Sequence, residues 1–149
     1  MDASIYEQLS SYCAYQERCV NDVRQKLYKL KVLKEDYGDY IDKLQQQNFL
    51  NEDRFVKYFV SSHQKKKWGK SKMKAALAGK RIHEAIIKKY LDNIDTEDYD
   101  AQIKEIAAKK WKSVKGATLR DRKTKLLRFL LGKGYEMSKA IAAIKELEP

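Results

Sequence analysis

Helix-breaking residues are scarce in this chain of 149 residues, and that scarcity limits its fold more than any other feature. Proline occurs once, as the final residue Pro149, and there are six glycines. Both residues destabilise helix interiors, and the tight turns of sheet proteins use them often. The sequence therefore predicts an all-α fold and argues against a sheet-rich one.

Apolar residues recur along the chain at the spacing of amphipathic helices. Val20, Val23, Leu27 and Leu30 stand three and four residues apart, which places them on one face of a helix within residues 17–30. The same pattern returns eight more times, and asparagine or aspartate precedes several of these stretches as a candidate cap. The sequence predicts about nine short helices.

The predicted helices fall into an internal repeat. Leu27, Leu77 and Leu130 hold matching places near the end of the second helix of each group, about fifty residues apart. We predict three-helix repeats over residues 1–50, 51–94 and 95–149. Each repeat buries little alone, so stacked neighbours are expected to form an elongated, curved array. A compact globule of nine helices without a repeat is the alternative.

The positive charge of the chain is concentrated beyond its first third. Residues 1–50 carry seven Lys or Arg against eight Asp or Glu, residues 51–94 carry twelve against four, and residues 95–149 carry thirteen against nine. Cations gathered on one face repel one another until an anion neutralises them. This asymmetry favours a polyanion or an acidic protein as partner, while a basic face that only aids solubility is the alternative.

The residue types that build catalytic sites are too few and too scattered to form one. His63 and His83 are isolated, and Cys13 and Cys19 have no histidine at the spacing of a metal site or an activated thiol. We therefore expect no enzyme activity, no catalytic or metal-binding residue and no cofactor. The lack of a leader segment, of a disulfide framework and of a run of roughly 18 apolar residues predicts a cytoplasmic protein without membrane contact. We expect it to be a monomer.

The strongest candidate binding feature is a lysine-rich stretch at residues 65–74, named here the basic segment. Six of its ten residues are lysines, and they flank Trp68, which looks exposed, and Gly69, which frees backbone amides. Phosphate groups are the natural complement of such a stretch. The alternative for Trp68 is that its ring packs at a helix hinge. The candidate contact residues here are Lys65, Lys66, Lys67, Trp68, Lys70, Lys72 and Lys74.

A second basic cluster lies on the equivalent helix of the third repeat. If the repeats align, the two basic helices would form one stripe. The members of this cluster are Arg120, Arg122, Lys123, Lys125 and Arg128.

Three motifs follow one another along the chain, at residues 48–56, at residues 67–77, and at residues 125–130 with Gly134 and Tyr135. Together they resemble motifs of the RecX family of RecA modulators. Residues 48–56 read Asn-Phe-Leu-Asn-Glu-Asp-Arg-Phe-Val, similar to the family's Gly-Tyr-Leu-Asp-Asp, one variable residue, then Arg-Phe-Ala. Residues 67–77 resemble the family's helix entry that contains Lys-Gly-Tyr-Gly. Residues 125–130, with Gly134 and Tyr135, are similar to its Lys-Leu-x-Arg-Phe-Leu and Gly-Phe signature. Asn48 and Trp68 depart from the family pattern.

The resemblance implies a regulatory protein of tandem three-helix repeats that lodges in the groove of the RecA–DNA filament. It would restrain ATP hydrolysis and strand exchange by RecA and hydrolyse nothing itself. Its partners would be RecA on DNA and the phosphate backbone of single- or double-stranded DNA. Carried over to this sequence, Arg54, Arg128 and the basic segment are the expected contacts, although Arg54 could instead pair with a neighbouring carboxylate.

Two other functions remain open at the level of the sequence. A stand-alone nucleic-acid-binding protein of helix-turn-helix type could present one of these helices to a major groove, but the basic segment holds Lys where base readout favours Arg, Asn or Gln. A scaffold for an acidic protein partner is the second alternative.

Overall fold

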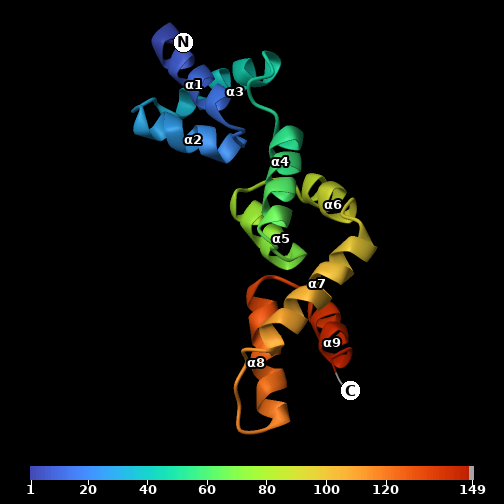
Figure 1. The fold of residues 1–149 in the computed structure, drawn as a ribbon. Helices are drawn as coiled ribbons and strands as arrows, with labels where there is room; N and C mark the ends of the chain where they lie inside the picture. Colours follow the sequence, from blue (N-terminus) through green and yellow to red (C-terminus); the bar gives the residue numbers. More distant parts are fainter. Residues whose placement is uncertain (148–149) are drawn as a thin grey trace. The chain divides into compact units, whose positions relative to one another are not determined.

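The computed structural model describes residues 1–147, and over that range the chain is helical, as predicted (Figure 1). It forms nine α-helices and one short 3-10 helix, with no strand among these residues. No helix within residues 1–147 is both long and apolar enough to cross a membrane. The helices are α1 Ala3–Tyr15, α2 Val20–Lys29, η1 Lys34–Asp36, α3 Tyr37–Gln46, α4 Glu52–Lys65, α5 Lys70–Gly79, α6 Glu84–Asp92, α7 Thr96–Trp111, α8 Leu119–Gly132 and α9 Met137–Lys145.

Local capping fixes where the first helices begin. The Asp2 carboxylate accepts hydrogen bonds from the backbone N–H groups of Ser4 (2.8 Å) and Ile5 (3.2 Å), which starts α1. The second helix begins at Val20, three residues later than the helix predicted to include Glu17. Asp22 explains the shift, because its carboxylate accepts from the Cys19 backbone N–H at 3.1 Å and so places the cap there.

The internal repeat is visible in one hydrogen bond that recurs in each group of helices. It closes the C-terminal end of the second helix, where a residue with positive φ is followed by a buried or half-buried apolar residue. The donor and acceptor pairs are Val32 N to Leu27 O at 3.1 Å, Ile82 N to Leu77 O at 3.3 Å and Tyr135 N to Leu130 O at 3.2 Å. The three leucines that indicated a repeat in the sequence therefore have the same structural role. The exact repeat boundaries remain a prediction.

The chain divides into two compact units, and the divisions fall inside α4, α5 and α6. Unit 1 comprises Met1–Phe59 and Leu77–Ile87, and unit 2 comprises Val60–Ala76 and the chain from Lys88 onward.

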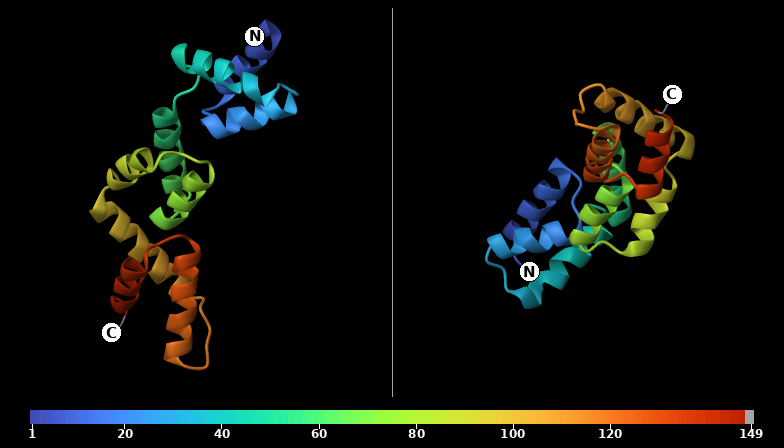
Figure 2. Two further views of the ribbon diagram at one scale, coloured as in Figure 1. Left: turned by 180° about the vertical axis from the view of Figure 1, so that it is seen from behind. Right: turned by 90° about the horizontal axis from the view of Figure 1, so that it is seen from below.

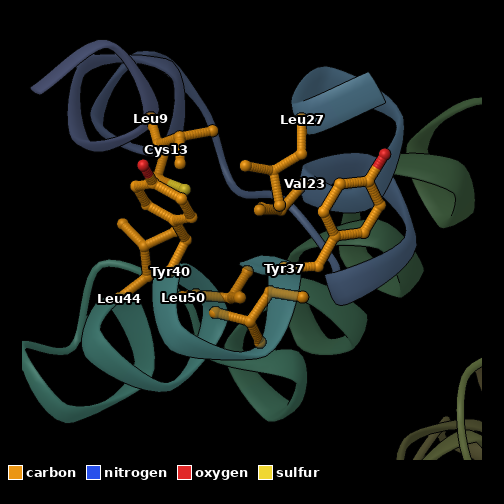
Figure 3. Packing of buried hydrophobic residues seen from close by; sticks show 9 residues of the cluster. Leu9, Cys13, Val23, Leu27, Tyr37, Tyr40, Leu44 and Leu50 are labelled. Atoms are coloured by element: carbon orange, nitrogen blue, oxygen red, sulfur yellow. The ribbon is translucent and has the colours of Figure 1, made fainter. Parts of the chain in front are cut away.

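Unit 1 is built around an apolar core between α1, α2 and α3. Their buried side chains point toward one another in the close view (Figure 3). A salt bridge joins α2 to the residues after α5, since the Lys80 ammonium lies 2.8 Å from the Asp22 carboxylate. The core consists of Leu9, Cys13, Val23, Leu27, Tyr37, Tyr40, Ile41, Leu44 and Leu50.

Unit 2 contains the bundle of α7, α8 and α9, which pack against one another and remain together in both further views (Figure 2). Ile103 and Ala107 of α7 and Leu126 and Leu130 of α8 are almost completely buried. Ala140 of α9 is fully buried as well, and a small residue there lets the helices approach closely. The loop between α4 and α5 and the start of α5 also belong to this unit.

Candidate nucleic-acid interface

The net charge of the protein resides entirely in unit 2. Unit 1 contains eleven Lys or Arg and eleven Asp or Glu, so its net charge is zero. Unit 2 contains twenty-one Lys or Arg and ten Asp or Glu, and its net charge of +11 equals that of the whole protein. The units divide the charge slightly differently from the sequence thirds, because residues 77–87, with a net charge of +1, belong to unit 1 and make it neutral. Unit 2 is therefore the part of the molecule suited to a polyanion.

The basic segment begins where α4 ends in a left-handed turn. Lys67 has φ 65°, and the backbone N–H groups of Lys67 and Trp68 donate to the carbonyls of Gln64 (2.9 Å) and His63 (3.0 Å). This pattern closes the helix and satisfies its last carbonyls. The backbone then turns at Gly69, whose carbonyl accepts the first hydrogen bond of α5, from Met73 N at 3.2 Å.

The backbone of the basic segment is hydrogen-bonded to the turn between α8 and α9. Gly69 N donates to Lys133 O at 2.7 Å, and Ser71 N donates to Gly134 O at 2.9 Å. A Cβ on Gly69 would stand 2.1 Å from the Gly134 carbonyl carbon, and a Cβ on Gly134 would stand 2.2 Å from the Cβ of Lys72. Glycine is required at both positions, so the segment has a fixed backbone rather than that of a free loop.

Two buried tyrosines strengthen this attachment. The Tyr135 hydroxyl donates to the Lys67 carbonyl at 2.7 Å and accepts from the Gln102 amide at 2.8 Å. The Tyr99 hydroxyl accepts from Lys70 N at 3.0 Å and donates to the Glu136 carboxylate. Burial raises the pKa of both tyrosines, and for Tyr99 the hydrogen bond to Glu136 raises it further. Both hydroxyls thus keep the protons that they donate.

Trp68 is packed rather than exposed. Its ring is half-buried and meets the His63 ring edge-on, with 4.3 Å between centroids, while the Lys72 ammonium lies 4.1 Å from its centroid. The hinge-packing alternative is the one that the structure favours, and the exposed appearance of Trp68 in the sequence was misleading. Trp68 and Lys72 together orient one ammonium group on this surface.

The lysines of the basic segment differ in how far they reach into solvent. Lys70 is half-buried, and its ammonium lies 4.9 Å from the Tyr99 ring centroid. The other five lysines are exposed, and the structure brings all six together on unit 2. The exposed lysines are Lys65, Lys66, Lys67, Lys72 and Lys74.

The second cluster on α8 is partly used for internal contacts. The Arg122 guanidinium donates to the carbonyls of Val114 and Trp111, both at 3.0 Å, and lies 3.9 Å from the Trp111 ring centroid. The Lys125 ammonium donates to the Lys115 carbonyl at 2.7 Å. These two cations hold the loop between α7 and α8, which sequence reasoning had not foreseen.

The rest of that cluster is spread along α8. Arg120 and Arg128 are exposed and Lys123 is half-buried. The basic segment bonds to the C-terminal end of α8, whereas Arg120 is at its N-terminal end, and a helix of 14 residues is roughly 21 Å long. Arg120 is therefore separated from the basic segment by most of the length of α8, whereas Arg128 lies about one turn from the end of α8 to which the segment is hydrogen-bonded.

Arg54 belongs to unit 1 and makes several internal contacts. Its guanidinium bonds to the Glu17 carboxylate and donates to the carbonyls of Asn48 (3.1 Å) and Phe49 (3.3 Å). Arg54 therefore forms an ion pair, as the alternative interpretation expected, but its partner is Glu17 and not a neighbouring carboxylate. Arg54 closes the turn before α4, and its side chain remains 37% exposed.

Sequence reasoning missed a group of lysines beside the basic segment. Lys109 and Lys110 of α7 and Lys133 after α8 surround a hollow that Lys67 also lines. Lys109 and Lys110 belong to a run of four lysines within residues 109–115, so charge density was a signal for these two, whereas Lys133 stands alone between two glycines.

Comparisons with known proteins identify the family. Residues 51–91 match the sequence model described as the second three-helix domain of RecX, and residues 97–144 match that of the third. This chain belongs to the RecX family. Family motifs in the sequence had pointed to the same group, and the helical repeats of the fold agree with it.

Named relatives are about one-third identical in sequence to this chain over the residues that align. The regulatory protein RecX of Clostridium perfringens strain 13 is 32% identical over 109 residues, which is 72% of this chain and 51% of that protein. RecX of Clostridium tetani is 33% identical over 99 residues, 64% of this chain and 44% of the relative. The chain thus spans about half the length of the curated relatives it matches.

Solved structures agree on the fold. A crystal structure of RecX from Lactobacillus salivarius superposes with a TM-score of 0.86 at 22% identity, covering 97% of this chain and 95% of that one. A second crystal structure of regulatory protein RecX gives a TM-score of 0.85 at 23% identity, with coverage of 97% and 71%. The all-α class with tandem three-helix domains is confirmed.

Proposed function

We propose that this protein binds the RecA–DNA filament and restrains RecA, lowering its ATP hydrolysis and its strand exchange. It acts by binding, without chemistry or a cofactor of its own, as a cytoplasmic monomer in recombinational DNA repair. The basic segment, with Arg120 and Arg128 of α8, contacts the phosphates and the protein surface of the filament.

The placement of charge is the observation that carries this proposal. The whole net charge of +11 lies in unit 2, and the densest part of it sits on a backbone fixed by the Gly69 and Gly134 contact. Because this backbone is already fixed, binding of phosphates by the lysines does not also have to order the chain between them. Lysines suit phosphates as point charges and carry little base readout, which favours a partner bound without a defined DNA sequence. Membership of the RecX family supports RecA as that partner.

Titration of this protein into the cognate RecA tests the proposal. The measurement is the rate of ATP hydrolysis by RecA on single-stranded DNA at physiological salt. We expect inhibition at or below stoichiometric amounts, because each bound molecule restrains several filament subunits.

No inhibition, with DNA binding intact, would contradict the proposal. A footprint at one defined DNA sequence would then support the helix-turn-helix alternative, and binding of a protein that survives nuclease treatment would support the scaffold alternative.

A further inference from the structure

Unit 2 contains a hollow of about 510 Å³ between α7, the end of α8 and the start of the basic segment. That volume lies within the range of roughly 300–1,000 Å³ typical of sites for small ligands. The hollow is lined by residues that are distant in the sequence, from Lys67 to Lys133, and the hydrogen bonds of Gly69 and Tyr135 hold these parts together.

The lining of this hollow combines an apolar floor with a ring of cations. Phe129 and Ile106 are half-buried and provide the apolar surface. Glu105 is the single carboxylate among the lining residues, so the site keeps a net positive charge. Four lysines line the same hollow, Lys67, Lys109, Lys110 and Lys133.

Two of these ammonium groups rest on the aromatic ring. The Lys110 ammonium lies 4.7 Å and the Lys133 ammonium 5.6 Å from the Phe129 ring centroid. A contact of this kind at a solvent-accessible site is worth only about 0.5–1 kcal/mol, so a phosphate can readily draw the ammonium group away from the ring. The ring is then uncovered for a planar partner.

A cation ring around an aromatic face has the chemistry that recognises a nucleotide. Lysines bind the phosphates, and the base stacks on the ring, since every base can stack on an aromatic side chain. A duplex cannot use this floor without unpairing a base, at a cost of a few kcal/mol, whereas a single strand offers its bases freely.

We propose that this hollow, named here the Phe129 pocket, binds one nucleotide unit of single-stranded nucleic acid. The phosphates on either side of this unit are held by Lys67, Lys109, Lys110 and Lys133, and its base stacks on Phe129. The inference rests on the proposed function only in that it specifies where DNA is contacted. It gives the protein a preference for single strands that the exposed lysines of the basic segment do not provide.

Direct binding without RecA tests this site. The probe is a fluorescein-labelled oligothymidylate of about 15 nucleotides, near the upper site size of a single-strand-binding module, followed by anisotropy over a salt series. A labelled duplex of equal length is measured in parallel. Phe129→Leu keeps most of the apolar surface but removes the aromatic face. The affinity for the single strand should fall about fivefold or more, which corresponds to the weakest stacking energies found for one base on an aromatic side chain. The affinity for the duplex should not change.

The charges of the pocket are tested by a matched pair of double variants. Lys110→Gln with Lys133→Gln should lower the salt slope of single-strand binding by roughly 1.4, which corresponds to two phosphate contacts. Lys115→Gln with Lys145→Gln removes the same charge from exposed positions of unit 2 outside the pocket. That control should change affinity less than about twofold, because salt screens distant charges.

Three results would overturn the inference. They are an unchanged single-strand affinity in Phe129→Leu, an equal loss in the pocket and control double variants, and no single-strand binding by the parent protein. Each can occur while inhibition of RecA ATP hydrolysis persists, so failure of the pocket is distinguishable from failure of the proposed function. Circular dichroism and the unfolding midpoint of each variant must match the parent for these readouts to count.

Discussion

Four non-glycine residues hold backbone conformations that glycine normally occupies. Lys31, Asn48, Lys67 and Arg81 have φ between 60° and 65°, each just after a helix end, and Gly134 has the equivalent place after α8. A Cβ in this region is crowded by the following carbonyl and costs roughly 1–2 kcal/mol. Asn48, which departs from the family's glycine, is the mildest of the four because asparagine tolerates this conformation.

Relief of that strain should stabilise the protein. We predict that Arg81→Gly raises the free energy of unfolding by about 0.5–1 kcal/mol, since the gain from losing the Cβ exceeds the added entropy of glycine in the unfolded chain. Urea denaturation followed by circular dichroism measures the change.

Arg81→Ala is the matched control, because it removes the same charge and keeps the Cβ. It should give no such gain. Equal stability of the two variants would show that the left-handed turn carries no strain worth relieving.

At the scale of the elements, the attachment of α5 to the turn between α8 and α9 depends on two glycines. We predict that Gly69→Ala lowers the free energy of unfolding by about 2 kcal/mol or more, because its Cβ would meet backbone atoms of Gly134 that cannot move without breaking two hydrogen bonds. Urea denaturation of the full chain provides the measurement.

Gly79→Ala in the same helix provides the comparison. Gly79 closes α5, and a Cβ there would meet nothing within 4 Å. This variant should be unchanged or more stable by up to about 1 kcal/mol, from the helix propensity of alanine. Similar behaviour of the two variants would contradict the close backbone contact at Gly69.

The elements themselves were predictable from the sequence, but their attachment was not. Periodic apolar residues and caps are local signals, so the helices and the repeat of Leu27, Leu77 and Leu130 could be read directly. The contact between Gly69 and Gly134 joins residues far apart in the chain, and a glycine leaves no periodic trace. Counting charge also could not show that Arg122 bonds to carbonyls while Arg120 remains exposed.

For the molecule as a whole, the separation of charge between two compact units underlies the proposed function. Unit 1 is neutral and unit 2 carries the whole excess of cations, which makes unit 2 the expected side for a phosphate-rich filament. The sequence located this excess only approximately, because the unit boundaries fall within α4, α5 and α6 and are set by tertiary contacts. Lys67 was an expected contact residue, but its meeting with Lys109, Lys110 and Lys133 depends on tertiary contacts that the sequence does not show.

The central claim is that the basic segment of unit 2 carries the regulatory activity toward RecA. Its most direct test is RecA ATP hydrolysis on single-stranded DNA in the presence of Lys66→Glu with Lys74→Glu. Both lysines are exposed, and neither is in an ion pair among the described residues, so the variant should fold as the parent does. Lys29→Glu with Lys34→Glu makes the same change at exposed positions of unit 1.

We predict that half-inhibition of RecA needs at least about tenfold more of the unit 2 variant than of the parent, a loss of roughly 1.4 kcal/mol in binding. The unit 1 variant should inhibit like the parent. Inhibition by the folded unit 2 variant at the concentration of the parent would contradict the central claim.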